Sequence, residues 1–95
     1  MITYRHHREV YTKQGDFDEW ILVAVYPTLE AAYEAAKRRL TSVTIIRWTE
    51  NEKGGGHGCS LGSGHWQWLP TLEQLQERDA RAATFEKEHF REQNA

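Results

Sequence analysis

The sequence predicts an α+β fold, in which an antiparallel sheet of about four strands carries two helices in the order ββαββα. Strand-length segments rich in aromatic and β-branched residues alternate with two amphipathic segments. The same tetrapeptide, Pro-Thr-Leu-Glu, opens both amphipathic segments, at residues 27–30 and at residues 70–73. A chain of 95 residues suits one domain, so residues 1–95 are expected to fold as a unit.

The first two strands are expected to form a hairpin. Residues 1–12 alternate loosely between apolar and polar side chains, which predicts a half-exposed first strand. Residues 13–16 predict a turn, in which Gly15 is free to take a positive φ. Residues 20–26 are apolar on both faces, a pattern typical of a strand inside a sheet. The sequence therefore places this strand centrally, with both of its faces covered.

A first helix is predicted over residues 28–40. Pro27 ends the preceding strand, and the Thr28 side chain is suited to cap the helix N-terminus. Apolar residues recur at helical spacing, and the alanines among them would let the helix sit close to the sheet. This stripe comprises Leu29, Ala32, Tyr33, Ala36 and Leu40. The basic residues 37–39 fall in the expected last turn, where cations suit the helix dipole.

The next part of the chain combines two strands with a long glycine-rich segment. Residues 43–50 predict the third strand. Residues 65–69 predict a short fourth strand, with Trp66 and Trp68 on one face. Residues 51–64 are dominated by glycine, which predicts a flexible loop between these two strands.

The C-terminal helix is expected over about residues 71–91. Its apolar stripe is weaker than that of the first helix, because Asp79 and Glu86 interrupt it. Its last turns are expected to project into solvent. The repeated Pro-Thr-Leu-Glu leaves two interpretations open: two successive ββα pseudo-repeats, or one capping solution used twice.

Composition favours an ordinary soluble domain. Hydrophobic residues make up 39% of the chain and charged residues 27%, and the net charge of −2 gives no global attraction for nucleic acid or an anionic membrane. No apolar run reaches membrane-spanning length, and the N-terminus lacks a signal-peptide pattern. A cytoplasmic protein without membrane contact is therefore expected. With Cys59 as its single cysteine, the chain can form no intrachain disulfide.

The glycine-rich segment carries only weak signals for phosphate or metal binding. It lacks the Gly-Lys-Ser/Thr ending of a phosphate-binding loop. His57, Cys59 and His65 are ligand types that zinc accepts, with Glu50 or Glu52 as a fourth ligand, but the paired spacings of structural zinc sites are missing. These three residues are weak metal candidates, and no cofactor is expected. A third functional class, a ligand-binding protein or enzyme, would use His7 together with them.

Aromatic and basic residues suggest two kinds of binding surface. Tryptophans beside Arg5, Arg8 and Arg47 would suit single-stranded nucleic acid, because bases stack on aromatic rings and phosphates pair with arginine. The same tryptophans are also typical of core packing and of protein-binding hot spots.

The absence of a catalytic constellation in the sequence favours a non-catalytic protein-binding module, acting as a steric inhibitor or adaptor, with nucleic-acid binding as the alternative. The candidate contacts are Trp66, Trp68, His57, Trp48, Arg5, Arg8, Phe85 and Phe90. A homodimer through an open sheet face or an edge strand is also expected, since a small monomer would not leave such a face exposed.

In size and in its economy of strands and helices, the chain resembles the small accessory proteins of phages and mobile elements. These include anti-CRISPR-type inhibitors and toxin-immunity proteins. The resemblance is one of style, so it implies a steric inhibitor and assigns no individual residue.

Overall fold

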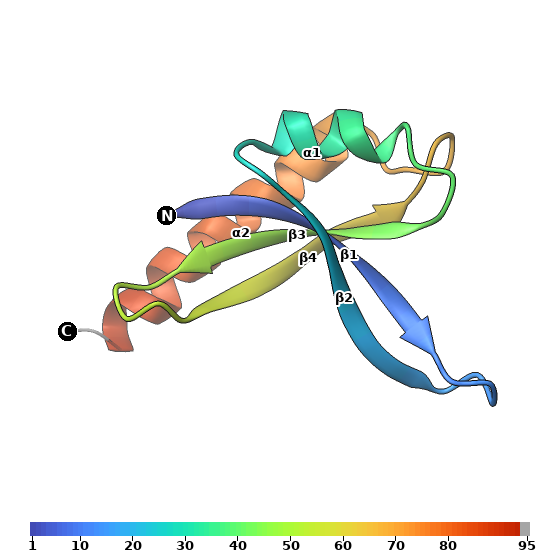
Figure 1. Cartoon of the computed structure of the whole chain (residues 1–95). Helices are drawn as coiled ribbons and strands as arrows, with labels where there is room; N and C mark the ends of the chain where they lie inside the picture. The colour runs from blue at the N-terminus through green and yellow to red at the C-terminus, as the bar shows by residue number, and fades with distance from the viewer. Residues whose placement is uncertain (94–95) are drawn as a thin grey trace.

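The predicted fold class is confirmed by the computed structural model, which describes the backbone of residues 1–93 and the side chains of residues 1–89. Four antiparallel strands form one sheet in the order β2-β1-β3-β4 (Figure 1). The elements are β1 Ile2–Tyr11, β2 Phe17–Tyr26, α1 Leu29–Ala36, β3 Val43–Glu50, β4 Gly56–Gly64 and α2 Leu72–Gln93. Within residues 1–93, no helix is long and apolar enough to cross a membrane.

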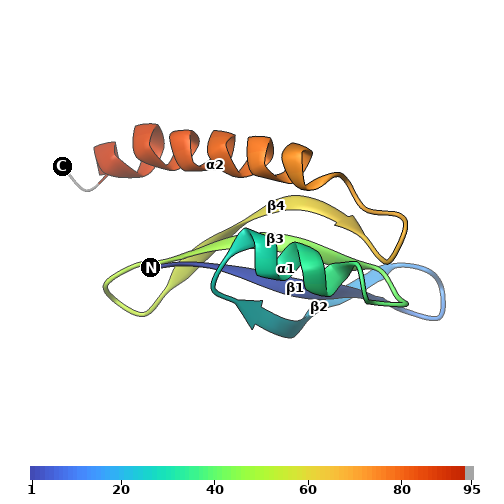
Figure 2. The ribbon, with the colours of Figure 1, turned by 90° about the horizontal axis from the view of Figure 1, so that it is seen from above.

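Both helices pack on the same face of the sheet, and the other face is open. Figure 2 shows α1 lying over the sheet and α2 running alongside β4. The core lies between α1, the first turns of α2 and the strands β1, β3 and β4. It comprises Tyr4, Leu29, Ala32, Ala36, Val43, Ile45, Leu61 and Leu75. The β1–β2 hairpin extends away from both helices, so its far end contributes little to this core (Figure 1).

The prediction of a central second strand is wrong, because β2 lies at the edge of the sheet. Most of its residues are exposed, although Trp20–Tyr26 is apolar throughout. The sequence-based argument assumed that an apolar strand is covered on both faces. In the isolated chain β1 pairs with β3 instead, since α1 carries the chain across β1 to its other side.

The prediction of a flexible loop over residues 51–64 is also wrong, because β4 begins at Gly56. The glycines are required by the neighbouring strand. A Cβ at Gly58 would lie 2.7 Å from Ile46 Cγ2 and 3.3 Å from the Trp48 indole, while one at Gly56 would lie 2.8 Å from that indole. The Trp48 ring therefore packs over backbone where side chains would otherwise stand, and glycine in a strand often marks such a close approach.

The first helix is shorter than predicted. Thr28 caps its N-terminus by accepting a hydrogen bond from the Ala31 amide, but the helix ends at Ala36. The basic residues 37–39 therefore follow the helix and do not form its last turn. Leu40, which was expected to be on the buried stripe, is 84% exposed. The tight turn formed by residues 37–39 takes Leu40 off the helical stripe.

The two halves of the chain have matching topology. Each half is an antiparallel hairpin followed by a helix, and the halves meet at the antiparallel β1–β3 pair. Thr71 caps α2 as Thr28 caps α1: its hydroxyl accepts from the Gln74 amide, and its own amide donates to the Gln74 side chain. The order β2-β1-β3-β4 is the order that two ββα units related by a pseudo-two-fold axis would have.

Candidate partner-binding site

The segment predicted as a fourth strand is instead a tight turn that presents two tryptophans. His65 and Trp68 are paired by two backbone hydrogen bonds, of 3.2 Å and 2.7 Å. A Cβ at Gly64, where φ is +158°, would lie 1.8 Å from the Trp68 carbonyl oxygen, so only glycine fits there. We call residues 65–68 the tryptophan turn.

The tryptophan turn holds Trp66 in a left-handed conformation, with φ of 36°. Among the described residues Trp66 is the only non-glycine residue with a positive φ. Such a conformation costs about 1–3 kcal/mol, and it persists only where the surroundings impose it. The Trp66 amide donates a hydrogen bond to the Ala36 carbonyl at the end of α1, which anchors the turn to the first half of the chain.

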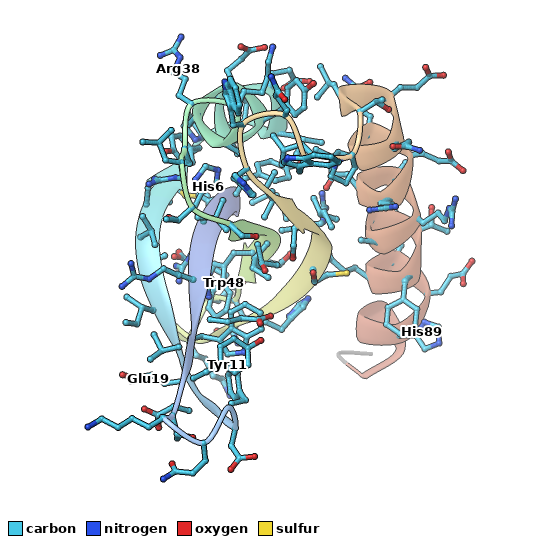
Figure 3. All side chains as sticks on the ribbon, turned by 90° about the vertical axis from the view of Figure 1, so that its right-hand side faces the viewer. His6, Tyr11, Glu19, Arg38, Trp48 and His89 are labelled. Atoms are coloured by element: carbon cyan, nitrogen blue, oxygen red, sulfur yellow. The ribbon has the colours of Figure 1, made fainter. Side chains whose placement is uncertain are left out.

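The tryptophan turn exposes two large aromatic side chains. Trp66 is 56% exposed and Trp68 is 73% exposed. The connection from α1 to β3 lies beside the turn, since Val43 pairs with Gly64, and it adds the exposed Leu40. Arg38 in that connection points away from the molecule (Figure 3). The turn and the neighbouring connection therefore carry exposed apolar side chains at one end of the sheet.

A second group of predicted contact residues lies on the open face of the sheet. The Arg5 guanidinium lies 4.2 Å from the centre of the Trp48 ring and 3.8 Å from the Glu50 carboxylate. Four polar atoms on this face are buried and have no hydrogen-bond partner among the described residues. They are Thr3 Oγ1, Arg5 Nε, His7 Nε2 and Trp48 Nε1. Burial lowers the pKa of His7, and the nearby Arg5 charge lowers it further.

Arg47, expected beside the tryptophans in a nucleic-acid groove, lies on the opposite, helix-covered face. Its guanidinium donates to Asp79 at 2.8 Å and to Glu86 at 3.2 Å. The Tyr4 hydroxyl donates to Asp79 at 2.8 Å, and the Thr49 hydroxyl donates to Glu86 at 2.9 Å. We call these five residues the arginine clasp. The clasp fastens α2 to the sheet, so the prediction of Arg47 as a phosphate contact is wrong.

The arginine clasp has a consistent electrostatic signature. Burial and the Asp79 carboxylate raise the pKa of the Tyr4 hydroxyl to about 12. Burial alone would raise the pKa of Glu86, but the hydrogen bonds from Arg47 and Thr49 outweigh it and lower this pKa. Tyr4 therefore remains protonated and Glu86 ionised near neutral pH, as the hydrogen bonds require.

The sequence contained a signal for this clasp that the predictions did not use. Asp79 and Glu86 are seven residues apart, so they lie on the same face of a helix two turns apart. That face also carries Leu72, Leu75 and Ala82, and these five residues form one stripe facing the sheet. Two carboxylates on a buried stripe require a cationic partner, and Arg47 provides it.

His6 is a buried histidine that the predictions treated as part of an exposed strand. Arg39 Nε donates to His6 Nδ1 at 2.8 Å, and since arginine can only donate, the His6 proton must be on Nε2. From there it is donated to the Ala32 carbonyl of α1 at 2.7 Å. Burial lowers the pKa of His6, and the Arg39 charge adds to this lowering. Neutral His6 therefore joins α1 to β1 (Figure 3).

The histidine and cysteine candidates for metal binding do not converge. His57 Nε2 lies 3.5 Å from Glu86 Oε1, beside the arginine clasp. Cys59 is exposed two residues further along β4, and His65 lies in the tryptophan turn. Among residues 1–89, whose side chains the structure describes, no three His, Cys, Asp or Glu side chains are grouped so that they could hold a metal ion.

The remaining predicted contacts are dispersed. Arg8 is exposed on the β1–β2 hairpin. Phe85 is 54% exposed on α2, where its ring stacks on His89 with centroids 3.9 Å apart. The side chain of Phe90 lies outside the described residues. The predicted contact residues therefore do not form one surface, and Trp66 and Trp68 are the two exposed ones that lie together in a single turn.

In comparisons with protein families, with curated proteins and with solved structures, no match to this chain was found.

Proposed function

We propose that this chain is a non-catalytic protein-binding module, whose tryptophan turn inserts into a partner protein and thereby blocks or tethers it. The observation that supports this proposal most is the strained, anchored conformation of Trp66. Backbone strain of this kind concentrates at functional sites. Tryptophan is among the residues most enriched at energetically dominant positions of protein interfaces, and the turn exposes two of them.

The rigidity of the tryptophan turn favours binding. Its backbone is fixed by Gly64, by the His65–Trp68 pair and by the hydrogen bond to Ala36. A pre-ordered loop loses little conformational entropy when it binds, which strengthens an interaction for a given contact area. In this proposal the turn inserts into a pocket of the partner protein, and the rest of the domain sterically excludes the partner's other ligands.

The test is affinity capture from a lysate of the cell that encodes the chain, with nuclease treatment and mass spectrometry. We expect a stoichiometric protein partner that survives nuclease, and we expect the Trp66→Gly/Trp68→Ser variant to lose it at least tenfold. Phe85→Ser is the matched control, because it removes an exposed aromatic ring far from the turn and should retain the partner. Equal recovery by the wild type and the tryptophan variant would refute the proposal. Circular dichroism should show that all variants are folded.

A second candidate function is supported by the open face of the sheet. The stacked Arg5 and Trp48, with unpartnered polar atoms beside them, are chemically suited to a nucleobase and its phosphate. Fluorescence anisotropy with a labelled single-stranded oligonucleotide tests this. Affinity that falls steeply between about 50 and 200 mM salt and is weakened by Arg5→Gln would support it. Equal binding by wild type and Arg5→Gln would remove it.

A further inference from the structure

The edge strand β2 presents an apolar surface that its own chain does not cover. Its apolar side chains are between 36% and 50% exposed, and they include both aromatic and β-branched residues. They are Phe17, Trp20, Ile21, Leu22, Val23 and Val25. Since β2 pairs only with β1, the backbone groups along its outer side also lack a neighbouring strand within the described part of the chain.

The usual protections of an edge strand are missing from the middle of β2. Natural edges are blunted by lysine, proline or inward-pointing charges, but Trp20–Tyr26 contains none of these. The opposite edge, β4, is different, because it is built largely of glycine and serine and α2 lies alongside it (Figure 2). The sheet therefore has one edge suited to pairing, and the sequence of that edge is typical of a central strand.

The pairing of β2 with β1 shows which face of the sheet the exposed β2 side chains occupy. Trp20, Leu22 and Val25 lie opposite Glu9, His7 and Arg5 of β1. Phe17 lies opposite Tyr11, which shares a face with these β1 residues. Two register shifts in the hairpin thus bring all four β2 side chains onto the open face of the sheet. We call Phe17, Trp20, Leu22 and Val25 the edge row.

We propose that β2 pairs antiparallel with β2 of a second copy of this chain, about a two-fold axis at Ile21. The result is a continuous sheet of eight strands, four from each copy. In this register Trp20 lies opposite Leu22 of the other copy, and Phe17 lies opposite Val25. Each pair joins an aromatic ring to an aliphatic side chain on the same open face, a favourable cross-strand combination.

The charges on β2 select this direction of pairing. Asp18 and Glu19 are the acidic residues of the strand, and both lie near its N-terminal end. A parallel pairing would place the acidic residues of the two copies side by side, which is destabilising. The antiparallel pairing separates them to opposite ends of the interface, where Asp18 faces Ala24 and Glu19 faces Val23. A second copy can approach because the hairpin extends away from both helices (Figure 1).

The size of the surface suits a second copy. The exposed parts of the six apolar side chains amount to an area on the order of 500 Å² per copy. Pairing at the edge covers the flanks of these side chains and leaves the sheet faces open, so the apolar contact is smaller than this area and the interface is a weak one. The backbone hydrogen bonds of a shared sheet add to this apolar contact. We therefore expect a reversible dimer with a dissociation constant in the micromolar range.

Sedimentation velocity over about 1–300 µM protein tests the dimer, with Leu22→Lys and Leu40→Lys as a matched pair. Both variants place a lysine at an already exposed leucine, so both should remain folded. Leu22→Lys should weaken dimerisation at least tenfold, because it brings two lysines into one small interface, whereas Leu40→Lys should leave it unchanged. A wild type that stays monomeric throughout, or equal effects of the two substitutions, would overturn the proposal.

A disulfide tests the register. Directly opposed residues of antiparallel strands have Cα atoms about 4.5–5.5 Å apart, within the range that a disulfide spans. In a Cys59→Ser background, Ile21→Cys should therefore form a covalent dimer under mild oxidation, at concentrations where Leu40→Cys does not. Equal crosslinking of the two variants, or no crosslinking of Ile21→Cys where the wild type is dimeric, would refute this two-fold pairing. The Trp66→Gly/Trp68→Ser variant should still dimerise, so this proposal and the partner-binding proposal fail independently.

Discussion

The two ββα units of this chain have the same order of elements and the same helix-opening tetrapeptide, yet they are held together by different interactions. In the first unit, α1 packs through small residues, Ala32 and Ala36, directly onto the sheet. In the second unit, the long helix α2 packs through Leu75 and Ala82 and is then fastened by the arginine clasp. The first helix is held mainly by apolar contact, and the second depends on buried charge.

The edge strands of the two units, β2 and β4, differ in how apolar they are. The first unit has a short helix and an apolar edge strand, β2, that the helix does not cover. The second unit has a long helix and a glycine-rich edge strand, β4, that needs little cover. The first unit therefore exposes apolar residues at the sheet edge, whereas the second unit buries most of its apolar residues within the domain. Two units with the same topology can thus differ in whether their edge strand exposes an apolar surface.

Breaking the arginine clasp should have the largest effect. Arg47→Met leaves Asp79 and Glu86 partly buried without their cation, and we expect it to lower the free energy of unfolding by about 3 kcal/mol. Urea unfolding measures this. Arg38→Met, at an exposed arginine, should change stability by less than about 0.5 kcal/mol. The triple variant Arg47→Met/Asp79→Leu/Glu86→Leu should recover most of the loss. If Arg47→Met were as stable as the wild type, the clasp would not be what holds α2.

Filling a glycine position of β4 should have an intermediate effect. Gly58→Val forces a side chain into the space of Ile46 and the Trp48 indole, and we expect a loss of about 2 kcal/mol from overpacking. Ser60→Val is the matched control, because it adds the same strand-forming residue at an exposed position of the same strand. Thermal unfolding compares the two. A Gly58→Val variant at least as stable as Ser60→Val would show that glycine is not required there.

The smallest effect should be a difference in pH dependence between the units. His6 in the first unit has a pKa lowered from 6.5, so the unfolded chain binds its proton first and stability falls as pH drops below 6.5. Glu86 in the second unit has a pKa lowered from 4.5, so its contribution is lost only as pH falls below 4.5. Urea unfolding at pH 7.5, 5.5 and 4 measures both windows.

The variant His6→Gln should flatten the upper pH window without changing the lower one. Glutamine keeps a hydrogen-bond donor for the Ala32 carbonyl but cannot take up a proton. Any slope that remains between pH 7.5 and 5.5 is expected from His7, whose pKa is also lowered. A variant with the same slope as the wild type would show that His6 does not control stability in this range.

The sequence was sufficient for the fold class and for the helix starts, because both depend on local signals. Periodicity predicted the helices, and the threonine caps at Thr28 and Thr71 are formed as expected. The fourth strand could not be predicted in the same way. Gly58 is in a strand because Trp48 lies across it, and that contact depends on a register that no local pattern reveals.

The sequence pointed to residues of the candidate site, but it did not predict how they are arranged. Trp66 and Trp68 were identified, but a strand would have put both on one face, whereas the structure places them in a strained turn. Arg47 was assigned to the wrong face because its partners lie more than thirty residues away in the sequence. Long-range partners decide both cases, and composition alone does not contain them.

The single cysteine has a practical consequence. Cys59 is exposed on β4 and pairs in register with Arg47, the centre of the clasp that fastens α2. A thiol-reactive fluorophore attached to the native sequence would therefore carry one dye per chain, close to the joint between helix and sheet. The molecule supplies its own position for a spectroscopic reporter, without any change to its four tryptophans.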